Sequence, residues 1–315
     1  GGFNSQYLGP LSWFLGVSVN QSSDFHVTIH QEQYIKKMME RFVPMQSASA
    51  IKHAMPCNPL TFQKLGTAAD EHERAKAKRL PYLQLIGSLI YLSTMTRPDI
   101  AYHMSVLCSF MHDPSPDCYY AAIDLLLYVV NTKHKHIHFT GSVKTPAGLD
   151  PSLSANICSN HGLIAYSDAS WRRPDKLGFS MFGFVIFLFG APVSYAAKKL
   201  KLVALSSAEA EYAAATYTCK EIMFIRNLLN DLFLDLHGET VLAIDNRACI
   251  QISENHGVTG RTQHFSEALH FIRHCVDHRI VKPAFVRTAF QRADGFTKAL
   301  GKGPFRDWSG HMLRE

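Results

Sequence analysis

A single carboxylate, that of Asp168, stands in the largely apolar stretch 165–171. This stretch predicts a buried strand, in which a carboxylate is costly unless it is paired, protonated or bound to a cation. Three acids further along the chain, Glu211, Asp245 and Asp294, favour the cation. Carboxylate oxygens are ligands for Mg²⁺, with Mn²⁺ as the alternative, rather than for Zn²⁺. Two such ions about 3.5–4 Å apart would support phosphodiester hydrolysis by activating a water and stabilising the leaving oxygen.

The start of a predicted long helix separates the roles of two neighbouring glutamates. Ser206 and Glu209 fit the S-x-x-E capping box, in which the glutamate reaches back to the end of the helix. Glu211 follows two residues later and lies about 200° around the helix. The sequence therefore predicts that Glu209 caps the helix and that Glu211 faces the other acids.

The elements that must position the acids follow from the hydrophobic periodicity of the second half. We expect strands over 163–168, 179–189, 193–197, 240–244 and 280–287, and helices over 206–236, up to 254, 262–278 and 291–300. This order predicts an α/β fold around a mixed sheet. Asp168 and Asp245 then end strands and Asp294 lies in the first turn of the last helix, so the carboxylates meet at one edge of the sheet.

The first half predicts a hairpin and a group of helices. Strands are expected over 7–19 and 25–29, and helices over 31–42, 83–94, 100–111 and 119–130. Asp99, which follows Arg97 and Pro98, is interpreted as a helix N-cap. Gly, Pro and Ser are frequent in 141–162, which predicts a linker between regions 1–140 and 163–315.

Composition bounds the class of protein. The 315 residues are 47% hydrophobic and 18% charged, which is typical of a globular chain and not of a disordered one. The net charge of +6 is compatible with a polyanionic partner. The 7 cysteines form no C-x-x-C pair, which argues against a cysteine zinc site and for reduced thiols in an intracellular setting. Neither a signal peptide nor a membrane-length apolar run is present, so we expect no membrane partner.

Several motifs together resemble one family. In the second half they are Tyr166-Ser167-Asp168-Ala169, segment 194–199, Ala208-Glu209-Ala210-Glu211-Tyr212, Asp245-Asn246, segments 261–264 and 270–273, Ala293-Asp294 and Thr297-Lys298. In the first half they are segments 8–11, 14–16, 33–34 and 86–92, and Thr96-Arg97-Pro98-Asp99-Ile100. The second half resembles the ribonuclease H domain of copia-type LTR retrotransposon Pol polyproteins. The first half is similar to the end of their reverse transcriptase region, with a primer-grip-like hairpin and thumb/connection helices.

The resemblance implies a fold and a set of roles. The fold would be a ribonuclease H-like mixed five-stranded sheet with flanking helices. Asp168, Glu211, Asp245 and Asp294 would bind the metal and carry out catalysis, and the substrate would be the RNA strand of an RNA–DNA hybrid, distinguished by its 2′-hydroxyls. The lysines near the end of the third strand would contact its phosphates or form a solvated turn: Lys198, Lys199 and Lys201. The chain would act in the cytoplasm, within the element's particle, or in the nucleus.

One part of the family's machinery is missing from the chain. The resemblance implies a polymerase site with an Asp-Asp pair, yet this sequence contains no Asp-Asp dipeptide. That site is expected to lie before Gly1, so the chain alone is not expected to polymerise DNA and would partner the missing polymerase portion. Two alternatives to the nuclease stay open: an inactive nucleic-acid-binding relic, and a structural partner of a separate reverse transcriptase chain.

Overall fold

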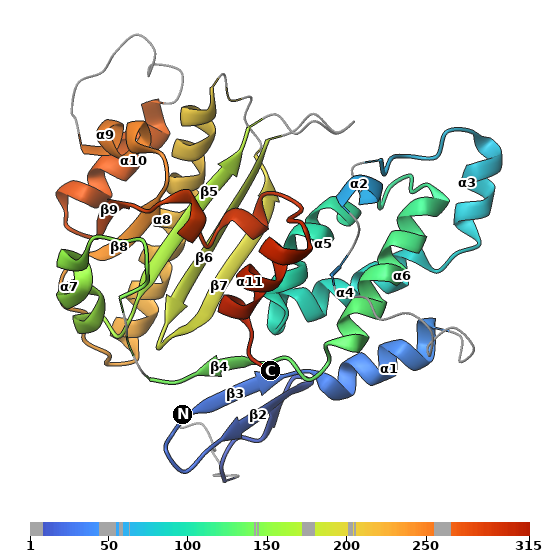
Figure 1. Ribbon diagram of the computed structural model, residues 1–315, viewed down its shortest axis with the longest axis horizontal. Helices are drawn as coiled ribbons and strands as arrows, with labels where there is room; N and C mark the ends of the chain where they lie inside the picture. Colours follow the sequence, from blue (N-terminus) through green and yellow to red (C-terminus); the bar gives the residue numbers. More distant parts are fainter. Residues whose placement is uncertain are drawn as a thin grey trace, which may run out of the picture.

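Two β-sheets and the helices packed on them make up the fold (Figure 1). The computed structural model describes residues 9–43, 55–56, 59–62, 64–141, 143, 145–171, 180–200, 204, 206–254 and 266–315. The predicted α/β class is confirmed, with a mixed five-stranded sheet preceded by a hairpin and helices. Within the described ranges, no helix is both long enough and apolar enough to cross a membrane.

The five-stranded sheet has the order β7-β6-β5-β8-β9. Its strands are β5 (Ile164–Ser170), β6 (Met181–Leu188), β7 (Ala191–Lys199), β8 (Thr240–Ile244) and β9 (Val281–Phe285). Strands β5, β6 and β7 form an antiparallel meander, whereas β8 and β9 run parallel to β5. Every residue of β8 is buried, as expected for a parallel strand covered on both faces. Pro283 is tolerated because β9 is an edge strand.

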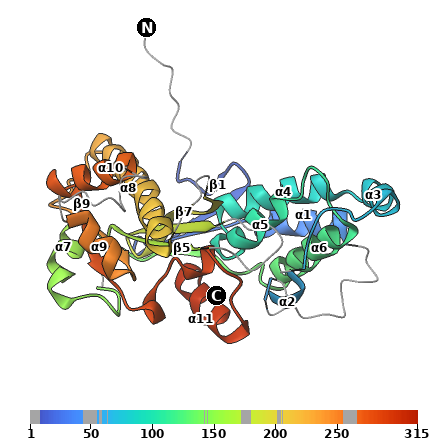
Figure 2. The same ribbon diagram turned by 90° about the horizontal axis from the view of Figure 1, so that it is seen from above.

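Helices cover both faces of this sheet. Figure 2 shows α8 (Ser207–Asp231) and α10 (Ser266–Asp277) on one side and α11 (Lys302–Met312) on the other. Helix α9 (Arg247–Glu254) contacts α8 and α10. Helix α8 is shorter than its predicted span of 206–236, because the chain turns at Phe233, which has a left-handed φ of 58°.

The first half contains the second sheet and its own helices. Its antiparallel strands are β1 (Trp13–Phe14), β2 (Val17–Gln21), β3 (Val27–His30) and β4 (Ile137–Phe139). Its helices are α1 (Glu32–Phe42), α2 (Pro59–Phe62), α3 (Glu71–Lys78), α4 (Tyr82–Met95), α5 (Ala101–Cys108) and α6 (Pro116–Asn131). The predicted helices over 31–42, 83–94, 100–111 and 119–130 are confirmed within a few residues. The predicted hairpin is present, but the expected strand over 7–19 is wrong: a turn at Leu15 and Gly16, both with positive φ, divides the described part of this segment into β1 and β2.

Segment 141–162, predicted to be a linker, carries structure of its own. It contains the 3₁₀ turn η2 (Pro151–Leu153) and the short helix α7 (Ser154–Ser159), which contacts β8. The division of the chain into 1–140 and 163–315 remains a prediction. The two regions are closely associated: buried side chains of α4, α5, α6, α11 and one face of the sheet form a single hydrophobic cluster.

Asp99 is not the helix N-cap that the sequence suggested. It lies in the 3₁₀ turn η1 (Pro98–Ile100) and forms a buried ion pair with Arg97, at 2.7 Å. The Tyr128 hydroxyl donates to the same carboxylate at 2.6 Å. The sequence suggested a cap because Asp is common at helix starts. In the structure the carboxylate instead pairs with Arg97, two residues earlier.

The last predicted helix, 291–300, is also wrong. The chain there forms two 3₁₀ turns, η4 (Thr288–Phe290) and η5 (Asp294–Phe296), and the final helix is α11, beginning at Lys302. Gly295 explains the close packing, because a Cβ on it would collide with the Trp308 ring of α11. Asp294 therefore begins a 3₁₀ turn that is wedged between the sheet and α11.

Candidate active site

Three of the predicted acids converge where the interior strands β5 and β8 of the five-stranded sheet end. Asp168 lies in β5, Glu211 near the start of α8, and Asp245 directly after β8. Each offers a carboxylate oxygen, and these oxygens lie within 4.8 Å of one another. These three side chains together are called the carboxylate group below. The register explains why the two aspartates meet. Tyr166 of β5 pairs with Ala243 of the adjacent parallel strand β8, and in each case the aspartate follows two residues later.

The helix cap turns Glu211 toward these aspartates. The backbone N–H of Glu209 donates to the Ser206 hydroxyl at 3.2 Å, which fixes the first turn of α8. Glu211, two residues on, is the glutamate that joins the carboxylate group. The prediction that Glu211 rather than Glu209 faces the other acids is confirmed.

Asp294 lies beside this group but is not a member of it. Its carboxylate forms an ion pair with Lys298 at 2.8 Å. The pKa of the Asp168 carboxyl is raised mainly by burial and, next, by the negative charge of Asp294. The structure thus gives the fourth predicted acid a cationic partner at the border of the carboxylate group.

Burial and mutual repulsion make the carboxylates hard to ionise. Burial, followed by the charges of Asp294 and Asp245, raises the pKa of Asp168 to about 7, although a hydrogen bond from Thr297 and the charge of Lys298 oppose this. Burial, followed by the charges of the three aspartates, raises the pKa of Glu211 to about 9. A bound divalent cation would remove this penalty, since it favours the ionised form of each group.

The donor atoms fit a hard divalent cation. All three ligand candidates are carboxylates, which is the chemistry that Mg²⁺ and Mn²⁺ prefer. The Glu211 Oε2 atom is buried and has no hydrogen-bond partner in the described part of the chain. A buried acceptor without a partner is costly, and a cation between the carboxylates would be its partner.

Three residues that were not predicted for the site support it: two donate to the carboxylates and one to the strand that carries Asp168. The Thr297 hydroxyl donates to Asp168 Oδ2, and the Thr288 hydroxyl donates to Asp245 Oδ2 at 3.1 Å. The Gln291 amide donates to the Ser167 carbonyl at 3.0 Å and ties the segment before η5 to β5. Of the three, only Thr297 belonged to a family motif, so only it carried a sequence signal.

Gly183 of β6 makes room for the turn that carries Thr297. It pairs across the sheet with Asp168, and a Cβ on it would collide with the Phe296 side chain and lie 3.1 Å from the Phe296 carbonyl carbon. Only the absence of a side chain at this position lets η5 approach the sheet closely enough for Thr297 to reach Asp168.

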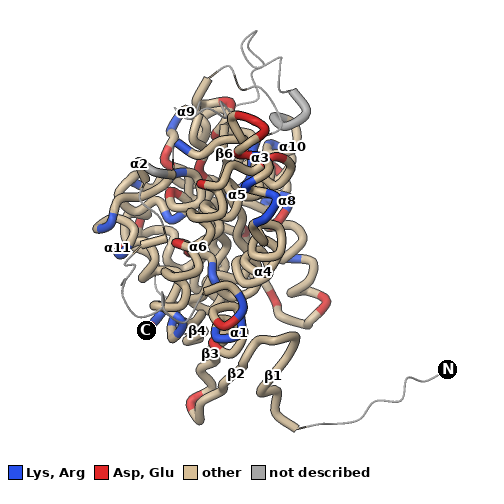
Figure 3. The backbone as a smooth tube through the Cα atoms, turned by 90° about the vertical axis from the view of Figure 1, so that its right-hand side faces the viewer, with Lys and Arg blue, Asp and Glu red and all other residues tan. Residues whose placement is uncertain are grey.

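Two of the three predicted lysines lie at the same end of the sheet as the carboxylates. Lys198 and Lys199 pair with Phe182 and Met181 near the end of β7. They are two strands away from Asp168, about 10 Å at ordinary strand spacing. Lys201 lies outside the described residues. In Figure 3, lysine and arginine are interspersed with acidic residues over the face in view.

Comparisons with known proteins place the chain among transposon polyproteins. No protein-family model matches it. It is 30% identical over 304 residues, 96% of its length, to the retrovirus-related Pol polyprotein from transposon TNT 1-94 of Nicotiana tabacum. It is 29% identical over 300 residues to the Pol polyprotein from transposon RE2 of Arabidopsis thaliana. The chain spans only 21% and 19% of these two relatives.

A solved structure is also similar to part of the chain. The crystal structure of LC11-RNase H1 in complex with an RNA/DNA hybrid matches 43% of this chain and 93% of that one. The sequence identity is 16% and the TM-score is 0.34.

Proposed function

Because the chain belongs to the retrovirus-related Pol polyproteins of copia-type transposons, we propose that it is a Mg²⁺-dependent ribonuclease H-type endonuclease that hydrolyses the RNA strand of RNA–DNA hybrids. The observation that carries the proposal is the meeting of Asp168, Glu211 and Asp245 within 4.8 Å, from three separate elements. A bound cation would offset the cost of burying these acids in their ionised form.

Each residue at the site has a part in this proposal. Asp168, Glu211 and Asp245 would hold the metal, which when bound supplies an activated water and neutralises charge on the phosphate. Asp294 would act at the border of the site, where Lys298 balances its charge. The hydroxyls of Thr297 and Thr288 keep two of the carboxylates turned toward the centre.

Family membership and the surface beside the carboxylates support a hybrid substrate. Lys198 and Lys199, at the same end of the sheet, would contact phosphates of the nucleic acid. The 2′-hydroxyl of the RNA strand would mark the strand to be cut. Polymerisation is not proposed for this chain, and the polymerase portion would be a partner.

The test is cleavage of an end-labelled RNA–DNA hybrid with Mg²⁺. Asp168→Asn and Glu211→Gln should each lower the rate by about a hundredfold or more, because each removes a charged ligand. Glu209→Gln is the matched control, since this acid lies on the same helix, two residues from Glu211, and outside the carboxylate group. It should cut at nearly the wild-type rate.

Two results would reject the carboxylate group as the site of reaction, and a third would reject cleavage itself. Metal-independent cleavage, or a Glu209→Gln variant as impaired as Glu211→Gln, would show that the carboxylate group is not the site of reaction. Tight hybrid binding without cleavage by the wild-type chain would favour the inactive nucleic-acid-binding alternative.

A further inference from the structure

A second site is suggested by a cavity of about 550 Å³ on the same face of β5 as Asp168. It is lined by Ile164, at the start of β5, and by Phe187, near the end of β6, whereas Asp168 lies near the other end of β5. The other sides are lined by Thr140, Thr145 and Ile157 and by the C-terminal residues His311 and Arg314. Its volume is in the range of cavities that hold small ligands.

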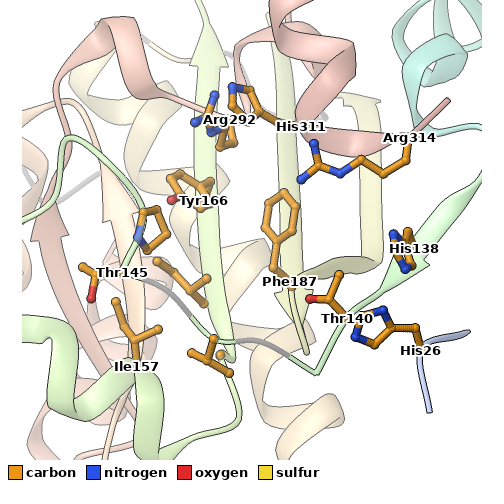
Figure 4. Close-up of a pocket in the computed structure, with 15 residues that line it drawn as sticks. His26, His138, Thr140, Thr145, Ile157, Tyr166, Phe187, Arg292, His311 and Arg314 are labelled. Atoms are coloured by element: carbon orange, nitrogen blue, oxygen red, sulfur yellow. The ribbon is translucent and has the colours of Figure 1, made fainter. Parts of the chain in front are cut away.

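The cavity has a cationic side without an acidic counterpart. Figure 4 shows Arg292, His311 and Arg314 along one side of it. No Asp or Glu is among the residues that line it within the described part of the chain. The guanidinium of Arg292 is half-buried, and no hydrogen bond or ion pair of it is found in the described ranges. A cation that is withdrawn from water without a counter-charge destabilises a fold, so the half-buried Arg292 favours an anion, and the exposed Arg314 adds a second positive charge beside it.

The wall of the cavity next to Arg292 combines apolar rings with an unpartnered donor. Tyr166 is 1% exposed, and its hydroxyl has no hydrogen-bond partner among the described residues. Its ring meets that of Phe187 edge to face, with centroids 6.0 Å apart. Figure 4 shows both rings facing the cavity below Arg292 and His311. A buried phenol donor gains stability from an acceptor oxygen, and the two rings suit a flat apolar group.

We propose that this cavity binds an organic phosphate of about mononucleotide size. The phosphate would lie against Arg292 and Arg314, whose planar guanidinium groups match phosphate oxygens in pairs. The flat ring of the ligand would lie against Phe187 and Tyr166. The site is separate from the carboxylate group and takes a ligand of opposite charge to a metal ion.

The test is binding of adenosine 5′-monophosphate to the full chain by titration calorimetry. The measurement is made in EDTA, so that no metal can draw the nucleotide to the carboxylates and the result does not depend on the proposed nuclease. We expect saturable one-to-one binding and a rise in melting temperature with nucleotide concentration. Adenosine, which lacks the phosphate, should bind at least about tenfold more weakly.

Substitutions assign the binding to the cavity. Arg292→Gln and Arg314→Gln should each weaken binding about tenfold or more, and Tyr166→Phe, which keeps the ring and removes only the hydroxyl, by about three- to tenfold. Arg306→Gln is the matched control, because this arginine lies in α11, outside the cavity lining, and its side chain is 82% exposed. It should bind as the wild type does.

Three outcomes would overturn the proposal. They are absence of binding at millimolar nucleotide, equal binding of the nucleotide and adenosine, and binding that Arg314→Gln and Tyr166→Phe leave unchanged. A duplex whose binding depends on Arg292 while the mononucleotide does not bind would equally reject a small-molecule site. Tyr166→Phe keeps the test decisive if an arginine variant fails to fold.

Discussion

At the scale of single residues, the ionised side chains of the carboxylate group repel one another, and a bound cation or protonation relieves this repulsion. Asp168 and Glu211 are both less than a tenth exposed, at 6% and 7%. Their pKa values are raised first by burial and then by neighbouring acids. The same arrangement that destabilises the metal-free fold prepares the site for a divalent ion, as is common where function opposes stability.

This repulsion predicts how the stability of the metal-free protein depends on pH. Folded Asp168 and Glu211, with pKa values of about 7 and 9, bind more protons than the unfolded chain, whose carboxyls titrate near 4. Stability should therefore fall as the pH rises toward 9, by up to about 1.4 kcal/mol per pH unit for each proton. His103 and His311, whose pKa values burial lowers to about 3 and 4, act in the opposite direction only below about pH 6.5.

The measurement is the melting temperature in EDTA between pH 7 and 9. Glu211→Gln should be more stable than the wild type at pH 9 and should show a flatter profile. Mg²⁺ should stabilise the wild type more at pH 9 than at pH 7. A wild-type melting temperature that rises across this range would contradict the assignment.

The Thr297 hydroxyl predicts a second effect at this scale. It donates to Asp168 and lowers the pKa of that carboxyl against the effect of burial. Thr297→Val removes the donor at nearly constant volume, so the Mg²⁺ concentration for half-maximal cleavage at pH 7 should rise about tenfold. Raising the pH to 9 should restore much of the loss, and Thr297→Ser should resemble the wild type. A defect of equal size at both pH values would indicate displacement of η5 instead.

At the scale of elements, two close approaches hold η5 in place. Gly183 lets the turn reach β6, and Gly295 lets α11 cover it through Trp308. The Trp308 indole N–H donates to the Arg292 carbonyl at 2.8 Å and fixes the helix against the turn. The position of Thr297 over Asp168 thus depends on a strand and a helix that contribute no carboxylate.

Replacing glycine with alanine should therefore lower the free energy of unfolding at one position and raise it at another. Gly183→Ala should lower the free energy of unfolding by about 1–3 kcal/mol, because its methyl group must displace Phe296 and the backbone of η5. Gly87→Ala is the control: Gly87 lies in α4, and a Cβ there would meet nothing within 4 Å. It should stabilise the chain by about 0.5–1 kcal/mol. Urea denaturation measures both, and a neutral Gly183→Ala would contradict the close approach.

At the scale of the whole molecule, α11 joins the two halves. Phe305 is 3% exposed and lies 5.7 Å from the Tyr128 ring of the first half and 5.9 Å from Trp308. Beyond α11, His136 and Arg314 exchange backbone hydrogen bonds of 3.0 and 2.9 Å next to β4. Figure 1 shows the C-terminus beside that strand.

This junction predicts that the two halves unfold together. Phe305→Ala should lower the free energy of unfolding by about 3–5 kcal/mol, as expected for a buried aromatic side chain. Phe233→Ala should change it by less than about 0.5 kcal/mol, because Phe233 is 92% exposed. Calorimetry should show one transition for the wild type and a split or broadened one for Phe305→Ala. Two separate transitions in the wild type would show that the halves are independent.

The sequence by itself determined the features that depend on neighbouring residues. Runs of apolar residues predicted the strands of the five-stranded sheet, the S-x-x-E pattern separated Glu209 from Glu211, and the order of the acids marked the site. The last helix could not be predicted in this way, because the packing of Gly295 against Trp308 overrides local preference.

Only the tertiary structure decided which groups meet. The register of β5 with β8 brings Asp168 to Asp245, and the return of the chain after β9 brings Thr297 to Asp168 and Arg292 to the cavity beside Tyr166. These contacts join residues far apart along the chain. They depend on strand order and side-chain packing, which local periodicity does not encode.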